Sequence, residues 1–426
     1  MTNAGGRSLW EATAPPVPQW PVLRENIRAQ VAIIGAGYTG LSAALHLAET
    51  GIDVVVLDGQ APGWGGSGRN GGQVIAGLKD DPDALAARFG ETAGERIAAF
   101  AGAAPDLVFD LIDRHAIACE ARRSGWLQLA VSTATMAAIA ARATQWQVRG
   151  APVSTINQTE ATRLTGATLY VGGALDRRGG TVQPLAYALG LAQAAGTQGA
   201  RIFAQSPATS LRRDCGGWVV ATPFGQVTAS TVIIATNAYT GALWPGLRES
   251  VVTLPSFQIA SDPLPAPLRA QILPERQSAS DTRRLLRYFR LDEAGRLVVG
   301  ARGVFGRQTL QQALRRHLTD VRDIFPQAAE LPFPYQWGGN VAITTDHLPH
   351  VHELAPGLLT ALGYNGRGVA LATAMGTALA AWAAGAPPEL PATPLRPVRL
   401  HRLSRLGAMA TVQYMRARDR IDHTHR

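Results

Sequence analysis

Three glycines and one acid within residues 31–58 have the types and the spacing of a dinucleotide-binding turn. Gly35, Gly37 and Gly40 form a G-x-G-x-x-G pattern, and Asp58 stands where such turns place an acid. The first glycine permits a tight turn, the second lets the backbone approach a pyrophosphate, and the third lets a helix pack closely on a strand. The acid binds ribose hydroxyls. The pattern therefore predicts a site for a cofactor with an ADP moiety.

A second glycine-rich loop follows Asp58 at once. Residues 59–73 read GQAPGWGGSGRNGGQ and include Ser67, Arg69 and Asn70. Backbone N–H groups in such a loop can hold a second part of a long cofactor. A nicotinamide enzyme is expected to continue with another strand and helix instead. The loop therefore favours a flavin dinucleotide.

The elements that must position these residues fit a Rossmann-like α/β unit. Residues 31–34 form a short apolar run typical of a buried parallel strand, residues 41–49 predict a helix, and residues 53–57 predict the next strand. The start of the helix would face the phosphates, where its dipole favours negative charge.

Further motifs are spread along most of the chain. Residues 179–185 read GGTVQPL, residues 232–239 read VIIATNAY, residues 337–349 read WGGNVAITTDHLP, and residues 363–368 read GYNGRG ahead of a predicted helix at 369–384. In this order they resemble the D-amino-acid oxidase (DAO) superfamily of FAD enzymes. The gamma-glutamylputrescine oxidase-like branch, related to glycine and sarcosine oxidases, matches best. Asn237 stands where that superfamily has a glycine.

The resemblance implies FAD as the cofactor and the oxidation of a C–N bond. The flavin of this superfamily takes a hydride equivalent from the carbon next to an amine, the imine hydrolyses, and O2 or another acceptor reoxidises the flavin. Relatives that tether FAD use a histidine in the loop that matches residues 64–72 or a cysteine near residues 337–349, and this chain has neither. We therefore expect non-covalent FAD. The residues expected to contact it are Gly35, Gly37, Tyr38, Thr39, Gly40, Asp58, Trp64, Ser67, Gly68, Arg69, Asn70, Gly71, Gly72, Ala235, Thr236, Asn237, Gly363, Tyr364, Asn365, Gly366, Gly368 and Val369.

Five residues are candidates for catalysis or substrate contact. Tyr288 and Arg290 lie two apart on a predicted strand and so share a face. Tyr335 and Trp337 adjoin a family motif and would form an aromatic wall that attracts an amine by cation–π interaction. Arg69, in the flavin loop, would stabilise the reduced flavin or bind the substrate. For each aromatic residue, ordinary core packing is the alternative.

Lysine is nearly absent. Lys79 is the only lysine among the 40 basic residues. Sarcosine-type relatives place one lysine just after the C-terminal glycine loop to hold the substrate carboxylate, and another over the flavin to speed its reaction with oxygen. This chain has Val369-Ala370-Leu371 at the first of these places. The resemblance therefore argues against a sarcosine-like substrate and leaves the electron acceptor open, although an arginine could grip a carboxylate.

Composition indicates a globular enzyme. Of 426 residues, 46% are hydrophobic and 17% charged. The net charge of +9 comes from scattered arginines, with clusters at residues 283–290 and 396–420. We interpret the second cluster as a helix packed on the protein's own surface rather than as an RNA- or lipid-binding element, and predict no nucleic-acid partner.

Other sequence features favour a cytoplasmic protein. The N-terminal residues lack the apolar stretch of a signal peptide, and no apolar run is long and uncharged enough to predict a membrane span. Cys119 and Cys215 provide no disulfide framework. His347, His350 and His352 have a spacing that zinc accepts, but the superfamily motif already explains this segment, so we predict no metal.

The motifs predict two domains built from alternating segments. After an N-terminal arm at residues 1–29, the FAD domain would take residues 30–84, 171–245 and 336–386. A mostly helical insertion at 85–170 and a strand-rich insertion at 246–335 would form an α+β substrate domain with an antiparallel sheet over the flavin. Residues 387–426 would be a basic tail or helix.

Two alternatives to a simple amine oxidase or dehydrogenase remain open. A tRNA-modifying flavoenzyme uses a similar FAD domain, and the chain is basic. A non-catalytic flavin-binding subunit of a heteromeric amine dehydrogenase is the other. The sequence leaves open the small-molecule amine, the acceptor and the oligomeric state, a homo-oligomer included.

Overall fold

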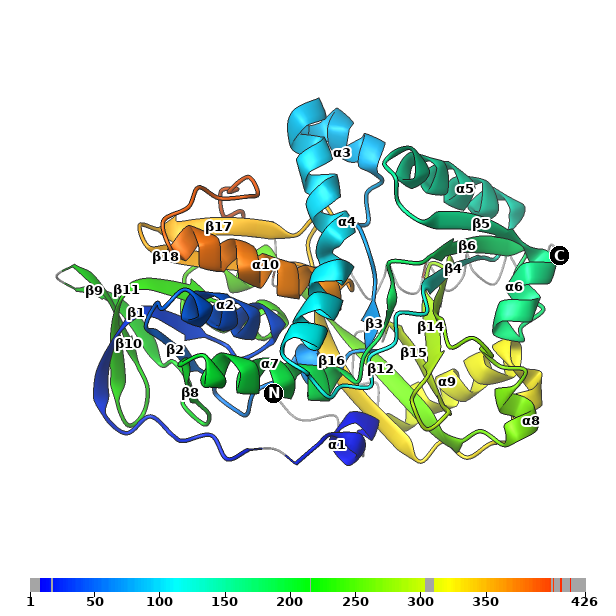
Figure 1. The fold of residues 1–426 in the computed structure, drawn as a ribbon, viewed down its shortest axis with the longest axis horizontal. Helices are drawn as coiled ribbons and strands as arrows, with labels where there is room; N and C mark the ends of the chain where they lie inside the picture. Colours follow the sequence, from blue (N-terminus) through cyan, green and yellow to red (C-terminus); the bar gives the residue numbers. More distant parts are fainter. Residues whose placement is uncertain are drawn as a thin grey trace.

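The structure is a computed structural model that describes residues 8–16, 18–214, 216–302 and 310–399, together with residues 401, 407 and 414. Most of the predicted basic tail beyond residue 399, and Cys215, lie outside the described residues. Figure 1 shows two sheets side by side, with α4 standing between the helices of the two halves.

The first sheet is a Rossmann-like layer. Its main order is β17-β18-β11-β1-β2-β8, and β1 pairs in parallel with both β2 and β11. The strands β2 and the second half of β1 are buried throughout, which explains why their residues are almost all Val, Ile and Leu. The hairpin β9–β10 pairs with the first residues of β11, whose last residues pair with β18. The bounds are β1 Asn26–Ile34, β2 Val54–Leu57, β8 Arg201–Phe203, β9 Ser210–Asp214, β10 Gly217–Ala221, β11 Gln226–Ile234, β17 His350–Ala355 and β18 Leu358–Leu362.

Small residues let the helices of this half pack closely. The helices α2 (Tyr38–Glu49) and α10 (Gly368–Ala383) lie side by side over the sheet, next to α7 (Pro184–Thr197). A Cβ atom at Gly376 of α10 would stand 2.6 Å from Ser42 Cβ of α2. The hydroxyl of Ser42 donates to the Thr373 carbonyl of α10 at 2.7 Å.

The second sheet runs in the order β16-β12-β15-β14-β13-β4-β6-β5. All its pairs are antiparallel except β13 with β4, which joins the strands of the two insertions. Alternation along the strands gives the sheet an apolar face, which includes Leu127, Phe289 and Val299 and is covered by α9 (Leu310–Ile324), and a more polar face. The strand bounds are β4 Trp126–Ala130, β5 Val153–Asn157, β6 Gly172–Asp176, β12 Val252–Pro263, β13 Ser278–Asp281, β14 Arg287–Leu291, β15 Arg296–Arg302 and β16 Tyr335–Ile343.

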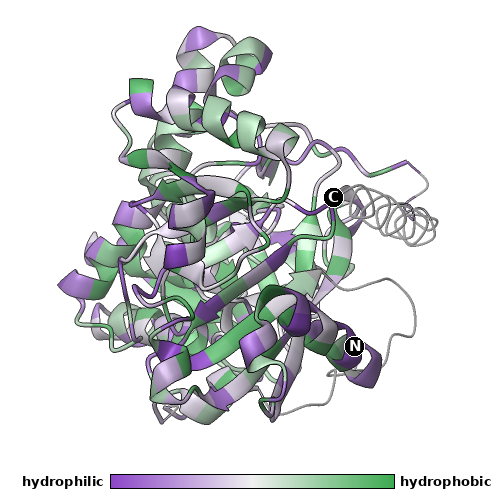
Figure 2. Cartoon of the chain, turned by 90° about the vertical axis from the view of Figure 1, so that its right-hand side faces the viewer, coloured by the Kyte–Doolittle hydropathy of each residue, from purple (hydrophilic) through white to green (hydrophobic). Residues whose placement is uncertain are grey.

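The remaining elements connect and flank the two sheets. A two-stranded ribbon, β3 (Gln73–Val74) with β7 (Gly180–Thr181), lies between them. Seen from the side in Figure 2, the peripheral helices alternate hydrophilic and hydrophobic residues, as surface helices do. Within the described part of the chain, no helix combines the length and apolarity that crossing a bilayer requires. The other helix bounds are α1 Leu9–Thr13, α3 Pro82–Phe89, α4 Glu91–Arg114, α5 Thr133–Val148, α6 Gln158–Thr165 and α8 Ala266–Arg269, with short 3-10 helices at Gly66–Gly68, Asn237–Tyr239, Arg248–Ser250 and Pro326–Ala328.

The two-part architecture agrees with the expected fold class, but several boundaries differ. The predicted helical insertion also contributes β4 and β5 to the second sheet, and β6 and β16, predicted within FAD segments, pair there too. The predicted N-terminal arm contains the first residues of β1. Short strands such as β4 were missed because helical periodicity dominates the residues around them, and their pairing partners lie far away in the sequence.

Candidate active site

A cavity of about 720 Å³ lies between the two sheets. It begins at the carboxyl ends of β1 and β2, where open α/β sheets bind their ligands. It continues along residues 64–71 and 234–244 and reaches the polar face of the second sheet and the start of α10.

The first end of the cavity has the geometry of an ADP cradle. Gly35 has φ +111°, and a Cβ there would stand 2.9 Å from the Ala235 carbonyl oxygen. A Cβ at Gly40 would overlap the Gly35 carbonyl oxygen. The first turn of α2 begins after Gly37, which has no side chain to cap it, so backbone N–H groups remain for an anion. The cradle therefore fits a pyrophosphate.

Asp58 closes this end at the predicted place. Its carboxylate accepts hydrogen bonds from the backbone N–H groups of Ala36 at 2.7 Å and Gln60 at 2.8 Å. Burial raises the pKa of Asp58 above that of an ordinary aspartate, against the effect of these two donors. An ionised Asp58 is the form that can accept the hydroxyls of a ribose.

We expect the affinity for FAD to fall as the pH drops through the pKa of Asp58. Protonation removes an acceptor for ribose hydroxyls, and because the pKa is raised, the loss begins at a higher pH than for an exposed aspartate. The dissociation constant should rise by at most about tenfold per pH unit, measured by flavin fluorescence quenching in the apoprotein. Asp58→Asn should bind more weakly with no such slope. A wild-type curve as flat as that of the variant would contradict this role.

Asn70 braces the flavin loop. Its side-chain amide donates to the Ser67 carbonyl at 2.7 Å and to the Tyr38 hydroxyl at 3.1 Å, and its Oδ1 accepts from the Gly72 N–H at 2.7 Å. Trp10 of α1, which lies in the predicted N-terminal arm, donates its indole N–H to the Asn70 carbonyl at 2.8 Å. Bonds within the loop and contacts with α1 and α2 therefore hold its shape.

Arg69 lines the cavity and stacks on Trp64, with its guanidinium carbon 4.3 Å from the ring centroid. The backbone carbonyl of Arg69 accepts hydrogen bonds from Gln258 Nε2 and from Trp337 Nε1, the latter at 3.1 Å. Two strands of the second sheet, β12 and β16, therefore hold the flavin loop from the substrate side.

Two asparagines connect the C-terminal glycine loop, residues 363–368 between β18 and α10, to the segments that follow β11 and β16. Asn237 has φ +39°, a backbone conformation that favours glycine, the residue that the superfamily has there, and that asparagine also adopts. Its Oδ1 accepts a hydrogen bond from the Gly363 N–H at 3.0 Å. Asn365 Oδ1 accepts from the Thr344 N–H at 3.0 Å. Arg367 donates to the Ala76 carbonyl, and burial lowers its pKa to about 9.

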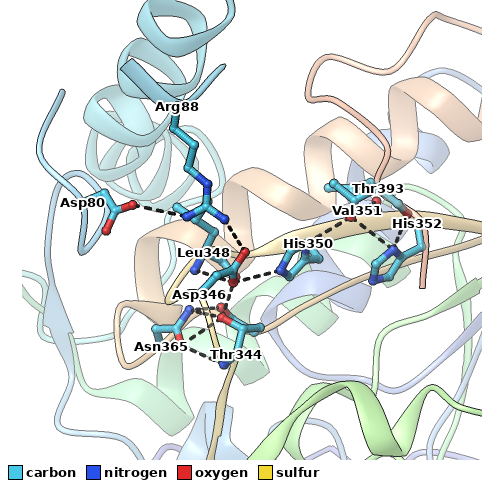
Figure 3. Close-up of polar contacts among 11 residues, drawn as sticks. Asp80, Arg88, Thr344, Asp346, Leu348, His350, Val351, His352, Asn365 and Thr393 are labelled. Carbon is cyan, nitrogen blue, oxygen red and sulfur yellow. Dashed lines mark hydrogen bonds and ion pairs between the residues drawn. The ribbon is translucent and has the colours of Figure 1, made fainter. Parts of the chain in front are cut away.

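Behind this loop, an ion-pair network holds residues 344–350 in place. Figure 3 shows Asp346 between Arg88, at 2.7 Å, and His350, at 3.1 Å. Burial acts to raise the pKa of Asp346, but the neighbouring His350 and Arg88 outweigh it and the pKa is lowered. The other ring nitrogen of His350 lies 3.0 Å from the Thr393 hydroxyl. Among the residues that the structure describes, no three potential ligands cluster as a metal site.

The polar face of the second sheet forms the far wall. Gln128 of β4, Ser280 of β13 and Tyr288 of β14 line the cavity there. The hydroxyl of Tyr288 lies 3.1 Å from that of Ser256, and burial raises its pKa to about 12, so it stays protonated. This wall offers uncharged donors and acceptors beside the flavin loop.

The structure does not place Arg290, Tyr335 and Trp337 on the cavity wall, in contrast to the sequence prediction. Arg290 shares a face with Tyr288 but is 1% exposed and donates to the Gly72 carbonyl at 3.0 Å and the Val182 carbonyl at 2.6 Å. Trp337 and Tyr335 pack with Trp10 and Leu9 of α1. The N-terminal arm covers this end of the sheet. Arg290 and Trp337 therefore hold the flavin loop, and Tyr335 packs against the arm.

The predicted cofactor residues fall into two groups. Four glycines lie off the cavity wall, where they allow a close approach of backbone segments or a positive φ: Gly40, Gly68, Gly72 and Gly363. The others line the cavity: Gly35, Gly37, Tyr38, Thr39, Asp58, Trp64, Ser67, Arg69, Asn70, Gly71, Ala235, Thr236, Asn237, Tyr364, Asn365, Gly366, Gly368 and Val369. Lining residues that the sequence did not identify include Lys79, Trp126, Gln128, Gln258 and Ser280. Strand alternation could have indicated Trp126 and Gln128, had β4 been recognised.

Comparison with known proteins agrees with this geometry. The sequence model of the DAO family, described as FAD dependent oxidoreductase, matches residues 30–382. The chain belongs to the DAO family. It is 31% identical over 364 residues to the gamma-glutamylputrescine oxidoreductase of Escherichia coli, covering 85% of each protein. It is 33% identical over 387 residues to the probable oxidoreductase OrdL of Rhizobium meliloti, covering 90% of each.

Solved structures share the fold of this DAO-family chain. The glycine oxidase of Geobacillus kaustophilus superimposes with a TM-score of 0.72 at 23% sequence identity, covering 87% of this chain and 99% of the other. The DAO-family chain is thus an FAD-dependent oxidoreductase, and the glycine cradle, Asp58 and the two loops are the parts of its structure that suit FAD.

Proposed function

We propose that this protein oxidises a C–N bond of a small amine or amino acid, with γ-glutamylputrescine-like compounds as the leading substrates. The name of the Escherichia coli relative supports this substrate class. The observation that carries the proposal is the meeting of the flavin loop with an uncharged polar wall, Gln128, Ser280 and Tyr288, in one cavity.

The roles of the chain's own residues follow from that wall. FAD, when bound, would supply the acceptor for a hydride equivalent from the carbon next to the amine, with the C=N bond formed from the nitrogen lone pair and a proton released to solvent. Tyr288, protonated because burial raises its pKa to about 12, and Gln128 can hydrogen-bond the substrate and orient it. Water then hydrolyses the released imine to a carbonyl compound and an amine or ammonia.

Arg69 and Arg367 supply positive charge from the two flavin loops. Both line the cavity, one stacked on Trp64 and the other over Trp126. With FAD held in this cavity, the two guanidinium groups would stabilise the negative charge that develops on the flavin when it is reduced. This arrangement is compatible with reoxidation of the flavin by O2 or by another electron acceptor.

Anaerobic absorbance of the yellow protein with an amine panel tests the proposal. The panel holds γ-glutamylputrescine, putrescine, sarcosine, glycine, proline and D-amino acids. We expect γ-glutamylputrescine to bleach the oxidised flavin band, and the rate of recolouring in air then separates an oxidase from a dehydrogenase. Acid precipitation should release the FAD, since no covalent tether is expected. Bound FAD that none of these amines bleaches would contradict the proposal.

A further inference from the structure

A second cavity, of about 430 Å³, lies behind the C-terminal glycine loop. Its size falls within the range of about 300–1,000 Å³ that is usual for small-molecule sites. The residues that line it belong to α3, α4, α10, the segment 344–352 and the segment 390–396, and none of them lines the flavin cavity. Its largest apolar side chains are Leu78, Phe89, Ile97, Phe100, Leu371 and Met375.

The segment after α10 is fixed against β17 at one side of this cavity. The Thr393 N–H donates to the Val351 carbonyl at 2.9 Å, and Ala392 forms a parallel bridge with Val351. The sequence placed these residues in a C-terminal tail, whereas the structure pairs them with the edge of the first sheet. The cavity wall on this side therefore has a defined shape.

His352 provides a hydrogen-bond acceptor on this wall. It lines the cavity and is 3% exposed. Its Nδ1 lies 2.6 Å from the Thr393 carbonyl oxygen, which can only accept, so Nδ1 carries the proton. Burial lowers the pKa of His352, so the ring is neutral at neutral pH and Nε2 is an acceptor. Nε2 forms no hydrogen bond with any residue that the structure describes.

The neighbouring histidine differs, because both of its ring nitrogens are engaged. His350 Nε2 lies 3.1 Å from the Asp346 carboxylate, and its Nδ1 lies 3.0 Å from the Thr393 hydroxyl. The rings of His350 and His352 are parallel, with centroids 5.7 Å apart, and Thr393 contacts both (Figure 3). Of the two imidazoles, His352 is the one that can accept a hydrogen bond from a ligand.

The charges of the cavity favour a ligand with an anionic group. Asp346 is the acid that lines it, and Arg88 and His350 already neutralise this carboxylate. Arg396 also lines the cavity and is exposed, so it stands where the cavity meets solvent. Within the described part of the chain Arg396 forms no ion pair, which leaves one uncompensated positive charge at this end.

We propose that this second cavity binds a small aromatic carboxylic acid that carries a ring N–H or a phenolic O–H. The ring packs on the apolar wall, the N–H or O–H donates to His352 Nε2, and the carboxylate pairs with Arg396. A donor for a buried acceptor and a partner for a cation each stabilise the complex. This inference does not depend on which amine the flavin site oxidises.

The two cavities share a wall. Thr344 lines the second cavity and donates its N–H to the Oδ1 of Asn365, which lines the flavin cavity, at 3.0 Å. Leu371 and Ala372 of α10 likewise line different cavities. A test must therefore distinguish an acid bound in the second cavity from one bound in the flavin cavity.

Isothermal titration calorimetry of the FAD-loaded protein with matched aromatic compounds tests the inference. Indole-3-acetate and 4-hydroxyphenylacetate have the ring, the donor and the carboxylate, and both should bind. 1-Methylindole-3-acetate lacks the N–H and indole-3-acetamide lacks the charge. Each of these two should bind about tenfold more weakly than indole-3-acetate.

Variants on the cavity wall locate the bound acid. His352→Asn keeps an N–H for the Thr393 carbonyl but removes the Nε2 acceptor. It should weaken indole-3-acetate about tenfold and should not weaken 1-methylindole-3-acetate. Arg396→Gln should weaken indole-3-acetate but not indole-3-acetamide. Arg399→Gln removes an exposed arginine that does not line the cavity and should bind every compound as the wild type does.

The outcomes separate the second cavity from other sites. Absence of binding heat for both indole-3-acetate and 4-hydroxyphenylacetate would overturn the inference. Binding of indole-3-acetate that is unchanged in His352→Asn and in Arg396→Gln would place the acid elsewhere and would also overturn it. Should His352→Asn fail to fold by circular dichroism, the comparison of methylated and unmethylated acid in the wild type, together with Arg396→Gln, decides the same question.

Discussion

A Gly40→Ala variant is expected to lose most of its FAD. The new Cβ would overlap the Gly35 carbonyl oxygen, so α2 must shift away from β1 and the cradle for the pyrophosphate opens. Overpacking of this kind costs about 1–3 kcal/mol, and we expect FAD to bind about 10- to 100-fold more weakly. The measurement is the FAD content of the purified protein, followed by titration of the apoprotein with FAD.

Gly196→Ala is the matched control. Gly196 lies in the last turn of α7, its φ is not positive, and a Cβ there meets nothing within 4 Å. This variant should keep its FAD and gain slightly in stability, because alanine favours a helix over glycine. Far-ultraviolet circular dichroism of both variants confirms folding. A folded Gly40→Ala protein with wild-type FAD affinity would contradict the assigned role of the cradle.

An Arg290→Met variant is expected to lose about 3 kcal/mol of unfolding free energy. Its guanidinium is the partner of the Val182 carbonyl at 2.6 Å and a second partner of the Gly72 carbonyl, both next to the flavin loop. Methionine fills much of the space but leaves the buried Val182 carbonyl without that donor. Chemical denaturation measures the loss, and FAD affinity should fall with it because Gly72 belongs to the loop.

The substrate dependence of Arg290 variants separates support of the loop from substrate binding. Arg290→Lys keeps a donor and should recover part of the stability. In all these variants the relative response to γ-glutamylputrescine and N-acetylputrescine should stay as in the wild type, because Arg290 lies off the cavity wall. An Arg290→Met protein of wild-type stability that loses only γ-glutamylputrescine would instead make Arg290 a substrate contact.

The nucleotide end of the site could be predicted from the sequence because its geometry is local. The turn between β1 and α2 depends on glycines a few residues apart, and Asp58 follows directly on the neighbouring strand. The order of the later motifs indicated the family for the same reason, since each one is a short turn next to a strand or helix. Asn237 departed from the family pattern, and only its positive φ and its bond to Gly363 explain the residue.

The substrate end could not be predicted in the same way. Tyr288 and Arg290 share a strand face, as their spacing requires, yet one lines the cavity and the other lies beneath the flavin loop. Which of the two meets the substrate depends on where α1 and the flavin loop cover the sheet. Trp337 likewise matched a motif and proved to hold the Arg69 carbonyl.

The sequence by itself determined the cofactor class, the family and the local form of the FAD cradle, because these depend on residues close together in the chain. The tertiary structure alone decided the substrate wall. It brought Gln128 of β4 beside Ser280 of β13 through a parallel pairing of strands about 150 residues apart, and it placed Lys79 in the same cavity. Contacts between distant segments depend on how two sheets pack, and no short pattern of residues encodes that.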